Sequence, residues 1–429
     1  MLSTLRNAWR VDDIRKKLIF VMFMILIYRL GNAVTVPYID SALLSAMFAD
    51  MNNSILGLIN VMSGSAMERA SIFAMSIQPY INASIIIQLL TFAIPALERL
   101  SKEGGEEGKA KIEKFTRYGT LAIALLQGLG FFVMIRNGGM LDPLATGFWP
   151  PVVIVGTFMA GSVLLMWMGE QITEFGIGNG ISVILFVSIV ARFPTEIGVM
   201  LQSMIRNPSS WWIYLLIAIG ALAIVALIVV VTNAERRIPV QYSKRVVGRK
   251  MYGGQSTHLP MKVNMAGVLP IIFAQAIASV PATIAIFVPR LSESWAMEHL
   301  FAPTAIPYAI IYFLLIIFFS YFYSTMQFNP IEVANNLKKN GGFIPGFRAG
   351  KPTSEFLQKI LSKITLFGAL YLAIIAVVPI IISRFSETAR DAGISMGGTS
   401  IIIVVGVALE TLKQLEAQLL MRHYKGFLE

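Results

Sequence analysis

Cysteine is absent from the sequence, and charged residues and histidines are scarce. None of the 429 residues is cysteine, 14% are charged and three are histidine. Without cysteine no disulfide or thiolate metal site can form, and cysteine usage indicates no redox compartment. The histidines lie in segments expected to be loops or the tail: His258, His299 and His423. Acid–base or zinc chemistry within the apolar segments is thereby excluded, so we expect no cofactor, no metal and no enzymatic activity.

Apolar residues are correspondingly abundant. They make up 56% of the chain, and the mean hydropathy is +0.69, whereas a soluble chain is about 45–50% apolar and about 25% charged. This composition predicts an all-α polytopic membrane protein. Because the basic segment 1–17 precedes a full-length apolar run, we expect no cleavable signal peptide. The apolar runs predict ten transmembrane helices, at about 18–36, 71–90, 118–135, 150–169, from 180 onward, 211–232, 263–288, 306–326, 364–383 and 397–420.

Basic residues are distributed unequally between the two sides of the membrane that ten spans define. One side holds 27 lysines and arginines and the other holds seven. The richer side carries both termini, and the positive-inside rule makes it cytoplasmic. It includes an amphipathic arm at 1–17, two long loops at 233–262 and 327–363, and a tail at 421–429. The arm suits an anionic membrane surface, although an ordinary positive-inside anchor explains its charge equally well.

The second expected span is too polar for a helix surrounded by lipid. It carries Gln78, Asn82, Ser84 and Gln88, and Pro79 lies inside it. Such stripes are tolerated where they face protein or water. The preceding apolar stretch 54–66 has only about half of the ~20 residues that a crossing needs. The pattern predicts a broken helix beside an aqueous path, although polar side chains that merely join neighbouring helices would look the same.

The seventh expected span has a similar polar face, formed by Asn264, Gln275 and Ser279. Division of the ten spans into halves at 18–204 and 205–420 makes the two polar helices the second member of each half. Unusual segments at corresponding positions indicate an inverted repeat with its path at the interface. The residues alone also allow a secondary transporter for a small solute, or a lipid or polymer flippase.

Four stretches carry a resemblance to a known family. SIFAMSIQPYINASIIIQLL, GEQITEFGIGNGIS, QSTHLPMKVNMAGVLP and NPIEVANNLKKNGGFIPGFRAGKPT resemble signature stretches of the SecY family. The resemblance implies two inverted five-helix halves around a central hourglass pore. It also implies a passive channel for unfolded secretory polypeptides, which releases signal sequences and membrane helices sideways into lipid. The expected partners are SecE-like and SecG-like subunits, a SecA-type motor ATPase and the ribosome. The expected location is a bacterial plasma membrane, and a thylakoid membrane fits the sequence as well.

The resemblance also assigns roles to individual residues. It implies a hydrophobic pore ring of Ile77, Ile81, Ile181, Leu185, Ile272 and Ile403, although ordinary packing explains any single isoleucine. A plug at 55–66 would include Ile55, Leu56, Leu58, Ile59, Asn60 and Met62. The lateral gate would be formed by Gln78, Asn82, Ser84, Gln88, Asn264, Gln275 and Ser279. Motor or ribosome docking is expected at Arg249, Lys250 and Arg348. Many relatives carry Gly-Ile-Met where this chain has Ser76-Ile77-Gln78, which adds polarity beside the pore.

Overall fold

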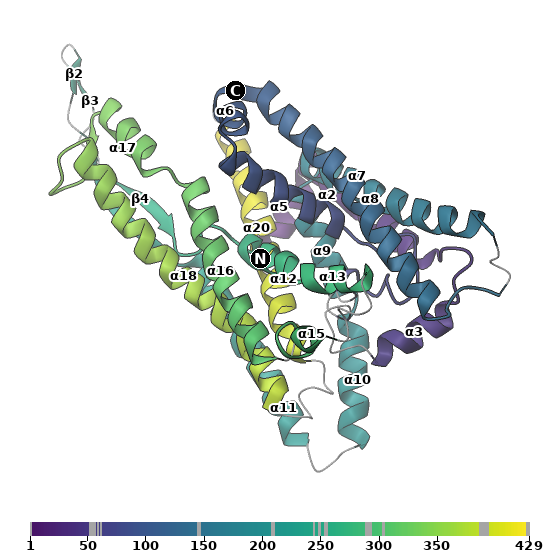
Figure 1. The fold of residues 1–429 in the computed structure, drawn as a ribbon. Coiled ribbons are helices and arrows are strands. Elements are labelled where there is room, and N and C mark those ends of the chain that lie inside the picture. Colours follow the sequence, from purple (N-terminus) through teal and green to yellow (C-terminus); the bar gives the residue numbers. More distant parts are fainter. Residues whose placement is uncertain are drawn as a thin grey trace.

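The computed structural model is a helical molecule with a small β-sheet at one corner (Figure 1). It describes residues 2–50, 57, 60, 62–143, 147–206, 211–242, 245–247, 250–252, 256–287, 294–302, 305–385 and 394–425. The helices of the first half are α1 (Leu2–Arg10), α2 (Asp12–Ala33), α3 (Ser41–Asp50), α5 (Gln78–Ala93), α6 (Pro95–Glu103), α7 (Gly105–Asn137), α8 (Trp149–Phe175), α9 (Gly180–Val190) and α10 (Phe193–Arg206). The helices of the second half are α11 (Trp211–Asn233), α12 (Leu269–Ala278), α13 (Val280–Phe287), α15 (Trp295–His299), α16 (Ile306–Gln327), α17 (Pro330–Lys339), α18 (Lys351–Phe385) and α20 (Ile394–Lys425).

Seven helical segments of the described chain are long and apolar enough to cross a membrane, and the bent pair α5–α6 makes an eighth. The two remaining expected spans correspond to α2 and to α12–α13. Helix α2 carries Arg29 within its apolar run. Helix α12 ends at Ala278 and α13 begins at Val280, so the apolar segment is interrupted at Ser279. Each expected position therefore holds an apolar helix, and the count of ten stays a prediction.

The two polar helices begin later than the sequence pattern predicts. Helix α5 starts at Gln78, and the preceding residues form turns in which Ala70 and Ser76 have φ of 47° and 52°. Ser71 consequently does not share a helical face with Gln78 and Asn82, which corrects the expected helix at 71–90. Pro79 explains the start: a proline lacks the N–H that a helix interior needs, but the first turn leaves that group unpaired anyway.

The same effect shifts the seventh expected span. Pro270 lies in the first turn of α12, so Asn264 precedes the helix and does not share a face with Gln275 and Ser279, contrary to the expectation. Asn264 Nδ2 instead donates to the carbonyl oxygen of Gly267 at 3.1 Å. Gly267 has φ of 63°, in the left-handed region that favours glycine. The chain thus turns tightly just before α12.

The long loops are more structured than expected, and they contain β-structure that an all-α assignment missed. Strand β1 (Glu235–Tyr242) pairs with β4 (Ser256–Lys262) in an antiparallel register of Glu235 with Lys262. Strand β5 (Gly342–Phe343) pairs with the other edge of β1. Strands β2 (Arg245–Val247) and β3 (Lys250–Tyr252) form a separate hairpin. The loop at 327–363 contains α17, β5 and the first turns of α18, and α20 extends into the expected tail as far as Lys425.

The strongly charged segment 96–117, which lies between two expected spans, is helical. It consists of most of α6 and the first turns of α7, which meet at Gly104. A Cβ at Gly108 would lie 2.0 Å from the Leu100 carbonyl oxygen, so only glycine fits at this close approach. Charged residues alone do not distinguish an exposed helix from a loop, because both present polar side chains to water.

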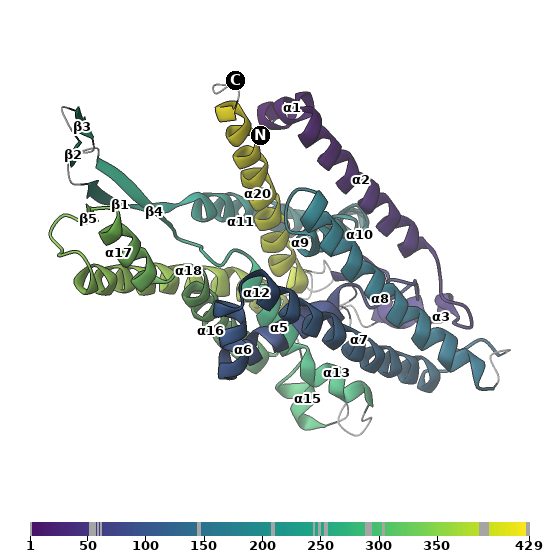
Figure 2. The same cartoon turned by 90° about the horizontal axis from the view of Figure 1, so that it is seen from above.

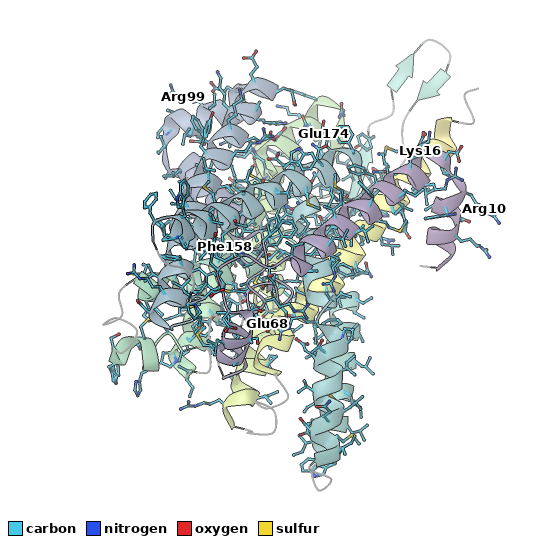
Figure 3. All side chains as sticks on the ribbon, turned by 90° about the vertical axis from the view of Figure 1, so that its right-hand side faces the viewer. Arg10, Lys16, Glu68, Arg99, Phe158 and Glu174 are labelled. Atoms are coloured by element: carbon cyan, nitrogen blue, oxygen red, sulfur yellow. The ribbon has the colours of Figure 1, made fainter. Side chains whose placement is uncertain are left out.

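In space, the helices form two groups with further helices between them. Helices α16, α17 and α18 lie on one side and α7 and α8 on the other, with α5, α12 and α20 in the middle (Figures 1 and 2). Helix α1 contacts the C-terminal part of α20, where Ala8, Ile14 and Leu415 are buried in one cluster. Figure 3 shows Arg99 and Glu174 toward one end of the molecule and Glu68 below its middle.

Candidate functional site

The six residues expected to form the pore ring all belong to one buried apolar cluster. Five are at most 3% exposed and the sixth, Ile181, is half-buried against them. They are contributed by the N-cap and first turn of α5 and by α9, α12 and α20. The cluster contains Ile77, Ile81, Ile181, Leu185, Ile272 and Ile403. Elements from both halves of the chain therefore contribute to one cluster, and all six of these residues are aliphatic.

Gly169 of α8 lies beside two of these residues. A Cβ at this position would lie 3.5 Å from Ile77 Cδ1 and 3.6 Å from Ile181 Cγ1. Gly180, at the start of α9, approaches α8 still more closely, because its Cβ would lie 1.9 Å from the Gly169 carbonyl oxygen. A side chain at Gly180 would therefore push α9 away from α8. Helix α9 begins with Asn179, whose Oδ1 accepts from the backbone N–H groups of Ile181 and Ser182.

A polar hollow of about 420 Å³ lies next to the apolar cluster. Its wall includes the turn before α12, the start of α9 and the side of α20, with Asn264, Glu410 and Lys413 among the lining residues. Val268 and Ile402 line the hollow and also belong to the buried cluster. Lys413 Nζ donates to the carbonyl oxygen of Thr232 at 3.3 Å. A water-compatible space thus ends directly on an aliphatic contact.

Met62 joins the two polar helices. Its sulfur accepts hydrogen bonds from Gln78 Nε2 of α5 at 3.2 Å and from Gln275 Nε2 of α12 at 2.8 Å. All three side chains are less than 9% exposed. Two of the expected gate residues are therefore brought together by one residue of the expected plug.

The segment around Met62 is anchored on both sides. Asn60 Nδ2 donates to Glu68 Oε2 at 2.7 Å, and Asn60 Oδ1 accepts from the Glu68 backbone N–H at 3.1 Å. Tyr28 of α2 places its hydroxyl 3.3 Å from the Ser63 carbonyl oxygen and 2.6 Å from Ser188 Oγ of α9. The other expected plug residues, Ile55, Leu56, Leu58 and Ile59, lie outside the described residues.

The remaining expected gate residues are less closely associated. Gln88 Nε2 donates to Ser84 Oγ at 3.2 Å within α5, and Gln88 Oε1 accepts from the hydroxyl of Tyr323 on α16. Ser279 Oγ donates to the carbonyl oxygen of Ala276, and Asn82 is half-buried on α5. Sequence reasoning missed Tyr323 altogether. The sequence pattern that could have indicated Tyr323 is its position on one helix face with Ser320 and Ser324. Ser320 Oγ donates to the Ile316 carbonyl oxygen of the same helix, and Ser324 Oγ bonds to Thr365 Oγ1 of α18.

Arg348 is exposed on a loop with a well-defined conformation. The ring of Phe347 stacks on that of Phe356 with centroids 4.0 Å apart, and Thr353 Oγ1 donates to the Arg348 carbonyl oxygen at 2.8 Å. Gly346 and Gly350 on either side have φ of 86° and 106°. These contacts present the guanidinium to solvent from a constrained backbone. Of the other expected docking residues, Lys250 begins β3 and Arg249 lies outside the described residues.

Within the described part of the chain, no group of three or more histidine or acidic residues could hold a metal ion. The fold and the site together define a polytopic helical membrane protein. In it, a hollow adjoins a buried apolar cluster that is formed by both halves of the chain. These features are typical of membrane channels and transporters.

Comparison with known proteins identifies the family. A sequence model of the SecY family matches residues 71–412. The protein translocase subunit SecY of Streptomyces scabiei is 45% identical over 443 residues, and that of Corynebacterium glutamicum is 43% identical over 446 residues, with both chains covered completely in each case. The chain belongs to the SecY family, the protein-conducting channel subunits of the translocon.

Solved structures agree on the fold. A protein-conducting channel has a TM-score of 0.63 at 16% identity, covering 94% of this chain and 92% of the other. A SecY protein whose plug domain stabilises the closed state of its channel has a TM-score of 0.65 at 17% identity, with the same coverage. Sec61 from a canine ribosome–channel complex has a TM-score of 0.60 at 14% identity.

Proposed function

We propose that unfolded secretory polypeptides cross the membrane through the path between the two groups of helices, and that the aliphatic ring seals this path at rest. The observation that carries the proposal is that both halves contribute buried aliphatic residues to one apolar cluster, which adjoins the polar hollow: Ile77, Ile81, Leu185, Ile272 and Ile403. An ion in a narrow aliphatic waist loses its water and gains no polar partner. A moving polypeptide passes because aliphatic side chains form no directional bonds with it.

We further propose that α5 and α12 are the two sides of a lateral gate. The small number of polar contacts between these helices supports this role. Both helices bond to Met62, and Gln88 of α5 also bonds to Tyr323 of α16. Each such hydrogen bond contributes about 0.5–1.5 kcal/mol. An apolar signal helix that packs between α5 and α12 supplies enough buried area to displace them, because complete burial of one leucine-sized side chain is worth about 1.5–3 kcal/mol.

The basic end of the molecule is proposed to face the cytoplasm of a bacterium and to bind the driving partner, either a SecA-type motor or the ribosome. Support comes from Arg348, which is exposed on a constrained loop, and from the charge asymmetry of the sequence. Ribosomal RNA is attracted to basic loops by its phosphates. Arg249→Glu with Lys250→Glu is therefore expected to weaken ribosome binding. The deficit relative to the parent should be largest at low salt, because the variant makes fewer phosphate contacts and its binding depends less on salt. SecE-like and SecG-like subunits complete the proposed assembly.

Reconstitution tests the proposed function against a small-solute transporter. The chain with its small partner subunits is placed in proteoliposomes with a motor ATPase, ATP and a secretory precursor. We expect ATP-dependent protection of the precursor from external protease, and no protection when its signal sequence is deleted. Ion-gradient-driven uptake of a solute without precursor protection would contradict the proposal.

A further inference from the structure

Met62 occupies a position between two carboxamides that belong to opposite halves of the chain. Its sulfur lies 3.2 Å from Gln78 Nε2 and 2.8 Å from Gln275 Nε2, and all three side chains are buried. A thioether is a weak hydrogen-bond acceptor compared with an amide oxygen. The two N–H···S contacts therefore hold the glutamines in place without binding them strongly.

Gln275 has an unused acceptor at the same place. Its Oε1 is buried and has no hydrogen-bond partner among the described residues. A buried amide oxygen without a partner is unfavourable, because it has lost its water without compensation. An amide donor lies close by, because Gln78 Nε2 and the Gln275 carboxamide contact the same sulfur atom.

The position of the sulfur is determined by the backbone on either side of it. A methionine side chain is unbranched and adaptable, so it does not fix its own position. Asn60 is bonded to Glu68, and Ser63 is bonded to Tyr28, which places Met62 between two anchors. Gly64 has φ of 67°, and a Cβ there would lie 2.9 Å from the Ser188 carbonyl oxygen, so this approach requires glycine. Movement of this segment therefore withdraws the sulfur from both glutamines at once.

We infer that Met62 is a positioning residue whose withdrawal allows Gln78 Nε2 to donate directly to Gln275 Oε1. The exchange replaces N–H···S contacts with an N–H···O bond between α5 and α12. Clearing of the path and opening of the gate thereby become separate events, because the gate helices remain joined after Met62 has left. This inference rests on the proposed function, in which α5 and α12 form the gate.

The test uses the full chain with its small partner subunits and two measurements. The resting current in planar bilayers reports closure of the path, and the fraction of a marginally apolar test segment released into the bilayer reports opening of the gate. Met62→Leu removes the acceptor and keeps the volume. Gln275→Met keeps the side-chain length and removes both amide atoms. Met168→Leu is the matched control, because Met168 is buried in the same apolar cluster but is carried by α8.

We expect Met62→Leu to raise the resting open probability by roughly fivefold or more, since the closed state loses the acceptor for two buried donors. Release of the test segment should rise much less in this variant than in Gln275→Met, where the amide oxygen that would accept from Gln78 is gone and only thioethers, which are weaker acceptors, remain. Gln78→Met should resemble Gln275→Met in release, which provides a second variant of the same pair. The control should behave as the parent in both measurements.

Two results would overturn the inference. A Met62→Leu current equal to that of Met168→Leu would show that the sulfur does not position the glutamines. Equal release in Met62→Leu and Gln275→Met would show that no amide pair forms after Met62 leaves. Precursor export by the parent, measured in the same vesicles, distinguishes failure of the inference from failure of the proposed function. If the parent exports the precursor, only the inference on Met62 fails. If the parent does not export it, the proposed function and the inference are both overturned.

Discussion

Replacement of three ring residues by asparagine should open the resting channel to ions. The variant carries Ile77→Asn, Ile81→Asn and Ile272→Asn, at positions that are 0%, 3% and 3% exposed. Most of their neighbours in the cluster are aliphatic and aromatic side chains, which offer a new amide few partners. Each new carboxamide therefore either remains unpaired or brings water into the contact.

The expected magnitude follows from this burial. A buried polar group without a partner costs about 1–3 kcal/mol in proteins, so three cost about 3–9 kcal/mol in the dry closed state. A difference of about 1.4 kcal/mol is a factor of ten in an equilibrium. The balance between dry and hydrated closure should thus shift by more than about a hundredfold toward hydration. Hydration of the ring removes the barrier to small ions.

The assay is single-channel current in planar bilayers without substrate, with the triple leucine variant at the same positions as the control. Leucine conserves the apolar volume, so that variant should remain closed. The asparagine variant should also export precursors with defective signal sequences, because its closed state is less favoured. A silent asparagine variant that still exports a normal precursor would mean that these isoleucines are ordinary core residues and that the seal lies elsewhere.

Three further outcomes are expected. Cysteines at Gln78 and Gln275, in this cysteine-free chain, should be joined by a short bifunctional maleimide and should then block export; free export through an efficiently joined pair would contradict the gate. Arg348→Glu should leave membrane insertion intact and reduce motor-driven secretion at least about tenfold, since loss of one charge at the centre of an interface commonly costs about 2 kcal/mol or more, and Lys351→Glu, at the first residue of α18, is the control for charge alone. Deletion of residues 56–64 should give a flickering resting current while export continues, and a current as quiet as that of the parent would argue against a plug.

Helical membrane class and the approximate positions of the spans were predictable from the sequence. Long aliphatic runs such as 211–232 can form only helices in lipid, because every backbone polar group must be paired internally. The seven long apolar helices confirm this class. Ile77 and Ile81 could be placed on one face in the same way, since residues four apart are neighbours on a helix.

Helix starts and the small sheet were not predictable from the same pattern. Hydrophobic periodicity does not distinguish a proline inside a helix from a proline in its first turn, and for Pro79 and Pro270 the first turn was correct. In the loop at 233–262, β1 has only Ile238 and Val240 buried, and they become core residues by packing with Leu357 of α18. That contact joins residues more than a hundred positions apart.

The apolar character of the ring, the polarity of Gln78 and Gln275 and the basic charge of the loops were determined by the sequence alone, because they are properties of residue types. Which polar atoms meet was decided only by the tertiary structure. Met62 lies 213 residues from Gln275, and no local periodicity relates the two. Their contact exists because α5 and α12, from different halves, pack on either side of the segment that carries Met62. Hydrogen bonds between distant side chains depend on the distance between atoms, and that distance is set only when the whole chain is folded.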